Sequence, residues 1–546
     1  MGYEEKYQSQ EYGRVRITTD QKAVTLKNVK QILLDAYNTH LVNRQRIKML
    51  VEFERGNQPL QREKTIRSEI DIKVVDNIAS EIINYKTGYK WGNPISYKQR
   101  GNNDIQKNDS ETDNEAIAMI NEMLNEENSF QEDTELAYYV ETCGVGYQIV
   151  DIRSEVEGNS LFRIKTLNPM NTFVVYDNTI YHSPVMGVTY VHDDLGNIHF
   201  TCLTADRRYE ILNFSKVECE GDQTETQMSF AERNGEANPM KRVNIVEFIR
   251  TNDRMGAFER EISAINALNI LESDFCNNVA QDTQSLWWGD NLELPEKKDE
   301  TGKVVGHMIP RSGGWILTSS GEQKKASVQP LVVSTPYDGI LNNVRYQRDI
   351  IKQRCFVPGT ASTSGGSTGS AMSMASGWES MEVQAQKEES FIREAKMKIA
   401  GLILTAVKES PFTPDGNPIL KLSLSDIEPN ILRDRNYDMA TKANTLATLL
   451  NCGIDPKDAI SVIKLFSDVN LVLSDSEEYL DLYYESKRAA ITRAQSGERS
   501  GDSEVQTDKD GTVKIGRTTQ DSSDQASNSP LIGGMKTTTG GSNGKR

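Results

Sequence analysis

The chain has 546 residues, a length that usually divides into several folded units, and 37% of these residues are hydrophobic. It carries 79 Asp and Glu against 62 Lys and Arg, a formal net charge of −17 at pH 7. This balance argues against tight nucleic-acid binding, which depends largely on cations that displace counterions from phosphates. Because no run of about 18 apolar residues exists, the sequence predicts no membrane-spanning helix.

The first half of the chain passes from helical to strand-like patterns. Apolar residues at helical spacing predict helices over residues 26–53 and 70–85. An acidic block at 104–135 contains another amphipathic helix, whose charges form either a solvated face or a docking surface for a basic partner. From 146 to 251 short alternating runs such as YQIVDI, FVVYD and NIVEFIRT, with a hairpin turn at HDDLGN, predict a strand-rich module.

Two helices then flank an insertion of about fifty residues. Helical spacing resumes at residue 258, short strand-like runs fill 286–336, and a further helix covers 337–355. Arg345, Arg348 and Lys352 on that helix are three and four residues apart, so they share one face. This basic face serves either solubility and intersubunit salt bridges, or contact with a polyanion.

A loose segment, CFVPGTASTSGGSTGS (355–370), stands directly before a long helical pattern. Such a segment can cradle a phosphate, join two domains or touch something that moves past it. A nucleotide-binding loop is not indicated, because no Lys follows Gly369 and no apolar strand leads in. The apolar spacing over 371–409 predicts a helix about 58 Å long, which must cross between modules or lie along a partner.

The end of the chain divides into a helical section and a polar tail. Residues 430–466 show helical patterns, whereas 486–546 consist mainly of Ser, Thr, Gly, Asp, Lys and Gln. A segment with so few apolar residues cannot bury enough surface to fold, so we predict that 486–546 is disordered.

Catalytic and metal-binding patterns are not evident. The six cysteines are scattered singly, which favours reduced thiols, and the five histidines show no metal-ligand spacing. Neither a GxSxG motif nor a paired-carboxylate motif stands out. We therefore predict a protein that is not an enzyme and has no cofactor or metal. A hydrolase that uses scattered carboxylates is the weaker alternative.

Several stretches in order resemble the portal proteins of tailed bacteriophages, in particular those of long-tailed phages of Gram-positive bacteria. VVDNIASEIINYKTGYKWGNPISY (74–97) is similar to the N-terminal segment of that family, and LNPMNTFVVYD (167–177) to its strand pair. The entry into the stem is matched by 244–269, the loop and helix start by 356–374, and the C-terminal helices by 436–469.

The resemblance implies an α+β portal fold and a ring-forming subunit whose long helix crosses the wing. The implied parts are the wing (1–256), the first stem helix (257–285), the clip (286–336), the second stem helix (337–355), the tunnel loop (356–370), the long wing helix (371–410), the crown (411–485) and the disordered tail (486–546).

The resemblance also implies a function: a ring, typically of twelve copies, at one capsid vertex of the virion, assembled in the host cytoplasm. Double-stranded DNA would pass through it during packaging and ejection, and the terminase motor, the head-tail adaptor, the major capsid protein and the scaffolding protein would be its partners. The implied tunnel loop comprises Val357, Pro358, Gly359, Thr360, Ser362, Thr363, Ser364, Gly365, Gly366, Ser367, Thr368 and Gly369.

In that arrangement Arg345, Arg348 and Lys352 are the candidate channel cations. A largely acidic ring with few such cations would guide DNA without gripping it. The alternative function is an acidic multi-domain scaffold or adaptor without a DNA channel.

Overall fold

The structure is a computed structural model, and the chain divides into two units, residues 1–469 and 470–546. Within the first unit it describes residues 13–60, 70–100, 110–155, 158–194, 196–214, 227–231, 234–283, 286–292, 296–298, 300–307, 315–319, 325–331, 337–359, 377–433, 439–452 and 454–463. Six single positions between 472 and 488 are described in the second unit. All structural statements below concern the first unit.

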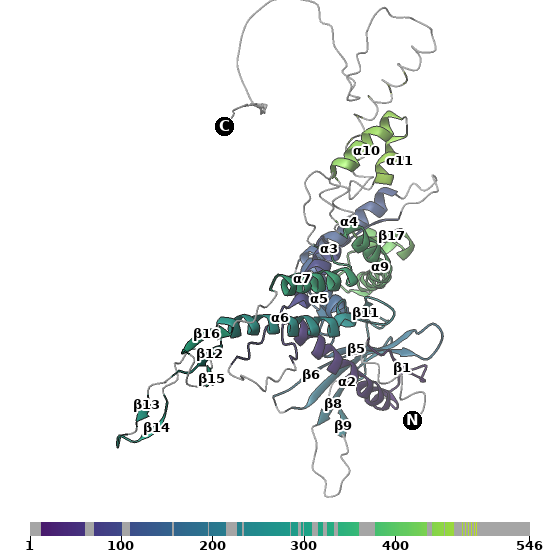
Figure 1. Cartoon of the computed structure of the whole chain (residues 1–546). Coiled ribbons are helices and arrows are strands. Elements are labelled where there is room, and N and C mark those ends of the chain that lie inside the picture. Colours follow the sequence, from purple (N-terminus) through teal and green to yellow (C-terminus); the bar gives the residue numbers. More distant parts are fainter. Residues whose placement is uncertain are drawn as a thin grey trace, which may run out of the picture. The chain divides into compact units, whose positions relative to one another are not determined.

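The fold is α+β, as predicted (Figure 1). The α-helices are α2 (Val29–Glu54), α3 (Ile78–Trp91), α4 (Ser110–Glu126), α5 (Ser129–Cys143), α6 (Ile262–Thr283), α7 (Tyr337–Arg354), α9 (Trp378–Glu409), α10 (Met439–Asn451) and α11 (Pro456–Ile463). A 3₁₀ turn, η1 (Glu259–Glu261), leads directly into α6.

The predicted strand-rich module forms two sheets. The larger has the order β1-β5-β6-β7-β8-β10 with β9 beside β8, and the smaller has β3 between β11 and β4. Their strands are β1 (Ile17–Thr19), β3 (Val145–Ile152), β4 (Phe162–Leu167), β5 (Thr172–Asp177), β6 (Pro184–His192), β7 (Ile198–Leu203), β8 (Arg207–Phe214), β9 (Gln227–Phe230), β10 (Glu236–Ala237) and β11 (Ile245–Ile249). The predicted HDDLGN turn joins β6 to β7, where His192 pairs with Ile198.

The predicted insertion also consists of short strands. The β12–β16 region contains β12 (Leu286–Asp290), β13 (Glu296–Lys298), β14 (Val304–His307), β15 (Trp315–Thr318) and β16 (Ser327–Leu331). Helices α6 and α7, which flank it in sequence, pack against each other, and Phe275 of α6 meets Tyr337 of α7 edge to face at 5.9 Å. The helix–insertion–helix order is thus present; the stem and clip roles stay a prediction.

Helix α9 is part of the same core as the smaller sheet. Its residues Ile392, Ile399 and Ile403 are buried with Phe162 and Phe248 of β4 and β11, alongside apolar side chains of α4 and α5. A third pairing, β2 (Ser96–Gln99) with β17 (Ile427–Asn430), contacts the same helix. The predicted long helix is confirmed from Trp378 onward, and its predicted residues 371–376 lie outside the described part.

The predicted helix over 70–85 is wrong at both ends. Residues 70–77 form neither helix nor strand, and the helix runs instead from Ile78 through Gly88 to Trp91. Residues 70–77 bond to α6: the backbone N–H groups of Ile72, Val74 and Asp76 donate to side chains of α6 at 2.8–3.0 Å. The long-range bonds satisfy the backbone that a helix would otherwise satisfy locally. We call residues 70–77 the strap.

A buried histidine makes the strand-rich module sensitive to acid. His40 of α2 is 2% exposed, stacks on Phe173 with ring centroids 4.6 Å apart, and contacts the Met170 carbonyl through Nε2 at 3.1 Å. Burial lowers the pKa of His40 to about 4, although the Met170 carbonyl acts in the opposite direction.

We expect this histidine to stabilise the fold at neutral pH only. The unfolded chain binds the proton near pH 6.5 and the folded chain only near pH 4, so the contribution is complete above pH 6.5 and is lost progressively as the pH falls from 6.5 to about 4. The loss amounts to about 3 kcal/mol of unfolding free energy. Urea unfolding from pH 7 to 4 should show a shallower pH dependence for His40→Gln than for the wild type; equal slopes would contradict the assignment.

Candidate functional site: the base of the Gly/Ser-rich segment

Helix α7 ends in a defined cap directly before the Gly/Ser-rich segment. The Val357 N–H donates to the Lys352 carbonyl at 2.9 Å and the Phe356 N–H to the Gln353 carbonyl at 3.0 Å. This bond pair is the Schellman motif, which requires a left-handed residue that is usually Gly. Here that residue is Phe356, with φ of 56°, while the following Val357 is buried with the core of α3, α6 and α7.

The left-handed phenylalanine predicts a stabilising substitution. A non-glycine residue in this conformation costs about 1–2 kcal/mol, and glycine gives part of that back as unfolded-state entropy. We expect Phe356→Gly to raise the free energy of unfolding by about 0.5–1 kcal/mol. Phe356→Ala is the matched control, since it removes the half-exposed ring but keeps the strain. Urea unfolding in which Gly is no more stable than Ala would rule out strain at this position.

The two ends of the segment lie together. A Cβ placed on Gly377, which has φ of 88°, would lie 3.8 Å from the Cα of Pro358. The chain therefore leaves α7 and returns to α9 at the same place. This geometry disfavours a linker between two separate domains, which was one of the three roles open from the sequence, and favours a closed excursion.

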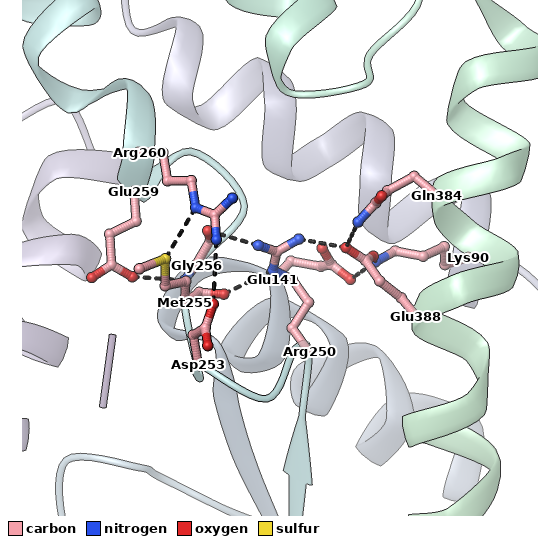
Figure 2. A network of polar contacts seen from close by, with 10 residues as sticks. All are labelled: Lys90, Glu141, Arg250, Asp253, Met255, Gly256, Glu259, Arg260, Gln384 and Glu388. Atoms are coloured by element: carbon pink, nitrogen blue, oxygen red, sulfur yellow. Dashed lines mark hydrogen bonds and ion pairs between the residues drawn. The ribbon is translucent and has the colours of Figure 1, made fainter. Parts of the chain in front are cut away.

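A buried ionic network ties α9 to its neighbours just beyond this point (Figure 2). Glu388 of α9 accepts from Lys90 of α3 and, at 2.5 Å, from Nη1 of Arg250 at the end of β11. Lys90 also pairs with Glu141 of α5, and all four side chains are at most 10% exposed. We call these four residues, Lys90, Glu141, Arg250 and Glu388, the Glu388 network.

Arg250 extends this network towards the start of α6. Its Nε donates to the Met255 carbonyl at 2.8 Å and its Nη2 to the Gly256 carbonyl at 3.1 Å. The Gly256 N–H in turn donates to Glu259 at 2.7 Å, as does the N–H of Gly13. Figure 2 shows this path from the Glu259 side across Arg250 to α9.

The charges in the Glu388 network shift their proton affinities. Burial alone would raise the pKa of Glu388, but the charges of Lys90 and Arg250 hold it well below its ordinary value. Burial lowers the pKa of neighbouring Lys86 to about 8, and the like charge of Lys90 acts in the same direction. The surroundings of the Glu388 network thus favour an ionised carboxylate at Glu388 and disfavour a further positive charge at Lys86.

A second buried pair lies two turns further along α9. Lys396 donates to Asp133 of α5 at 2.5 Å, and both side chains are at most 5% exposed. Gln148 of β3 donates to the same Asp133 oxygen at 2.9 Å. Two buried polar clusters, the Glu388 network and the Lys396–Asp133 pair, therefore hold α9 in register with α3, α5 and the smaller sheet.

The predicted tunnel-loop residues fall largely outside the described part. Val357, Pro358 and Gly359 are described, and the first two are buried. The remaining nine named residues lie between 360 and 369, so their role in a channel stays a prediction.

The three candidate cations differ in their surroundings. Arg345 is exposed and forms no ion pair within the described ranges. Arg348 pairs with Asp76 and Glu81, and Lys352, which is 5% exposed, pairs with Glu81 at 2.5 Å. Sequence spacing put the three on one face, but it could not show that residues nearly 270 positions away neutralise two of them.

Sequence analysis also missed the Glu388 network. Its members lie about 50 to 300 positions apart, and each sits among other charged residues. The only local signal is that position 388 falls on the apolar face of α9, in step with Ala385 and Ile392. A charged residue on an apolar face indicates a buried pair.

The described residues do not assemble into a metal centre. No group of three or more potential metal ligands is present among them, and no described helix is long and apolar enough to span a membrane. Five cysteines (143, 202, 276, 355 and 452) are free thiols. A cavity of about 550 Å³ between β11 and α9 is lined mainly by apolar groups, and its Glu247 is held by Arg254 at 2.8 Å.

Comparison with known protein families assigns the chain to a family. Residues 33–492 match the family described as "Phage portal protein, SPP1 Gp6-like". The chain belongs to this family of phage portal proteins. The match spans most of the chain, including the β12–β16 region, the Gly/Ser-rich segment and α9, and the resemblance drawn from the sequence is confirmed. As a portal protein the chain is a structural component of the phage particle.

Two further comparisons add little to this assignment. No curated protein matches the chain. Among solved structures it is similar to a chain of the "Neck of empty GTA particle computed with C6 symmetry", with 11% identity and a TM-score of 0.37, over 75% of this chain and 95% of that one. So low a TM-score is too weak to support any statement on assembly.

Proposed function

We propose that the portal protein forms a ring, of twelve copies as is typical for portals, at one capsid vertex, through which double-stranded DNA is packaged and ejected. The ring docks the terminase motor first and the head-tail adaptor later, contacts the capsid and scaffolding proteins, and has no catalytic activity. Such a ring needs a heterologous interface, in which one face of each subunit meets a different face of the next.

The observation that carries this proposal is the closed base of the Gly/Ser-rich segment in a chain of the portal family. Pro358 and Gly377, which flank residues 360–376 in sequence, lie side by side, so the described chain ends and resumes at one point. Glycine and serine change backbone dihedrals at low cost, and small hydroxyls offer sequence-blind contacts to phosphate and sugar. In the ring these segments line the channel where the DNA is held most closely.

Helix α9 connects this loop to the rest of the subunit. Its start adjoins the loop base, and its body is locked by the Glu388 network and the Lys396–Asp133 pair. A displacement of the loop is therefore passed to α3, α5 and the smaller sheet as a movement of a rigid helix. The wing, stem, clip and crown boundaries implied by the family belong to the same proposal.

Imaging the purified protein tests the proposal. Negative-stain microscopy should show rings of several hundred kilodaltons with a central hole, and cryo-electron microscopy should place residues 360–370 around that hole. A monomer would favour the scaffold or adaptor instead, and turnover of a nucleotide or ester would favour an enzyme. Loops on the outer rim, or a particle without an opening, would refute the channel.

A further inference from the structure

The cationic face of α7 is neutralised from within the subunit. Arg348 uses both terminal nitrogens, one on Asp76 of the strap and one on Glu81 of α3, while Lys352 binds the second oxygen of Glu81 at 2.5 Å. Glu272 of α6 also faces this group: burial raises its pKa, and so does Asp76, whereas Arg348 lowers it. Three carboxyl groups thus surround two cations.

The acidic partners are held in place before any ligand arrives. The Asp76 N–H donates to Asn269 at 3.0 Å, and Val74 and Ile72 are bonded to α6 in the same way. Glu81 lies in the first turn of α3, where the helix dipole favours a carboxylate. Because the backbone that carries Asp76 is bonded to α6 and the backbone of Glu81 is helical, only side-chain entropy is lost when the two carboxylates pair with α7.

Arg348 is the residue for which this arrangement matters most. Its side chain is 33% exposed, so it could reach a phosphate if its partners were absent, whereas the Lys352 side chain is 6% exposed and could not. A guanidinium binds a phosphate with the same paired geometry that it uses for carboxylates. Asp76 and Glu81 therefore occupy the donors that a phosphate would use.

We propose that Asp76 and Glu81 act as intrachain substitutes for phosphate, which prevent Arg348 from holding the DNA that passes through the portal. The inference rests on the proposed function, with α7 taken to face the channel, and adds to it a reason why Arg348 would not slow the DNA. Within the described residues Arg345 remains the exposed member of the three candidate cations.

The decisive variant is Asp76→Asn/Glu81→Gln/Lys352→Met, measured as the assembled ring. Lys352→Met is included because an unpaired buried lysine would destabilise the subunit. Binding of duplex DNA is followed over a range of salt concentrations. Affinity at low salt should rise at least about tenfold, and the slope of log K against log salt should steepen by roughly 0.9 for each arginine that engages a phosphate.

Two controls test whether any gain in DNA affinity comes from Arg348 being released by Asp76 and Glu81. Adding Arg348→Gln to the variant should return affinity and slope to the wild-type values. Asp338→Asn/Glu379→Gln removes two exposed carboxylates that form no ion pair in the described part of the chain, and should leave the slope unchanged.

The outcomes distinguish this inference from the proposed function. The role of Asp76 and Glu81 in keeping Arg348 from the DNA would be overturned if rings of the triple variant bound DNA with the wild-type salt slope. It would also be overturned if rings of the Asp338→Asn/Glu379→Gln control gained as much DNA affinity as the triple variant. Either result would leave the proposed channel intact. If the variant alone fails to assemble, the same measurement on Asp76→Asn decides. This substitution frees one terminal nitrogen of Arg348, while Glu81 still holds the other and Lys352, so the slope should steepen by less than in the triple variant; an unchanged slope would overturn the inference. Wild-type protein that forms no ring with an opening would refute the proposed function itself.

Discussion

Glu388→Gln is expected to lower the free energy of unfolding of the portal subunit by about 3–5 kcal/mol. The substitution keeps the shape of the side chain but removes the charge that compensates Lys90 and Arg250, both at most 10% exposed. Among the described members of the network Glu141 would still pair with Lys90, but Arg250 would lose its carboxylate, and Lys86 adds a further positive charge nearby. Uncompensated buried charge is among the most destabilising changes that one substitution can make.

The matched control is Glu394→Gln on the same helix. Glu394 pairs with Lys398 at 2.7 Å, but the two side chains are 66% and 57% exposed, so its loss should cost below about 0.5 kcal/mol. Urea unfolding of both variants at equal protein concentration and equal assembly state makes the comparison. Similar losses for the two variants would show that the Glu388 network contributes no more than a surface pair.

The same network predicts the direction of the pH dependence. Because the pKa of Glu388 lies well below its ordinary value, its contribution is complete at neutral pH and is lost only as the pH falls below the usual range for a glutamate. The wild type should therefore lose stability on acidification that Glu388→Gln has already lost. The difference between the two unfolding free energies should shrink as the pH is lowered.

Removing the side chains that hold the strap should release it from α6. In Asn269→Ala/Ser273→Ala/Asn277→Ala the backbone N–H groups of Ile72, Val74 and Asp76 lose their acceptors. A buried group left without a partner costs about 1–3 kcal/mol, so the strap should open rather than remain in place. Amide hydrogen exchange at residues 72, 74 and 76 should accelerate about a hundredfold or more.

Asn278→Ala is the control for the strap, since residue 278 is the exposed neighbour of Asn277 on α6. It should leave exchange at the three amides unchanged. The released strap should also weaken the Asp76–Arg348 pair, so the triple variant should bind duplex DNA more tightly than Asn278→Ala. Unchanged exchange in the triple variant would mean that contacts other than these side chains hold the strap.

Secondary structure was predictable for most elements that have one apolar face. Helices α2, α4, α6, α7 and α9 and the strand-rich module follow their hydrophobic periodicity. The prediction failed at 70–77, where apolar residues also recur at helical spacing but the backbone bonds to α6 instead. Periodicity indicates candidates for burial, and even this fails here, since Ile72 is 43% exposed; it does not show which partner the backbone takes.

Part of the candidate site could likewise be predicted from local sequence and part could not. The Gly/Ser composition of the loop and the spacing of Arg345, Arg348 and Lys352 could be read directly from neighbouring positions. The partners of Arg348 and Lys352 could not, because Asp76 and Glu81 lie in a distant part of the chain that shows no local sign of the pairing. The Glu388 network was likewise invisible, since charged residues are common throughout this acidic chain.

The amino-acid sequence by itself determined the class of this protein: its α+β composition, its order of most helices and strands, its Gly/Ser-rich segment and its membership of the portal family all depend on local patterns. Only the tertiary structure decided that the loop closes on Pro358 and Gly377, that α9 is held by buried ion pairs, and that two of three candidate cations are already neutralised. The physical reason is that burial and pairing of charge depend on residues brought together by folding from far along the chain.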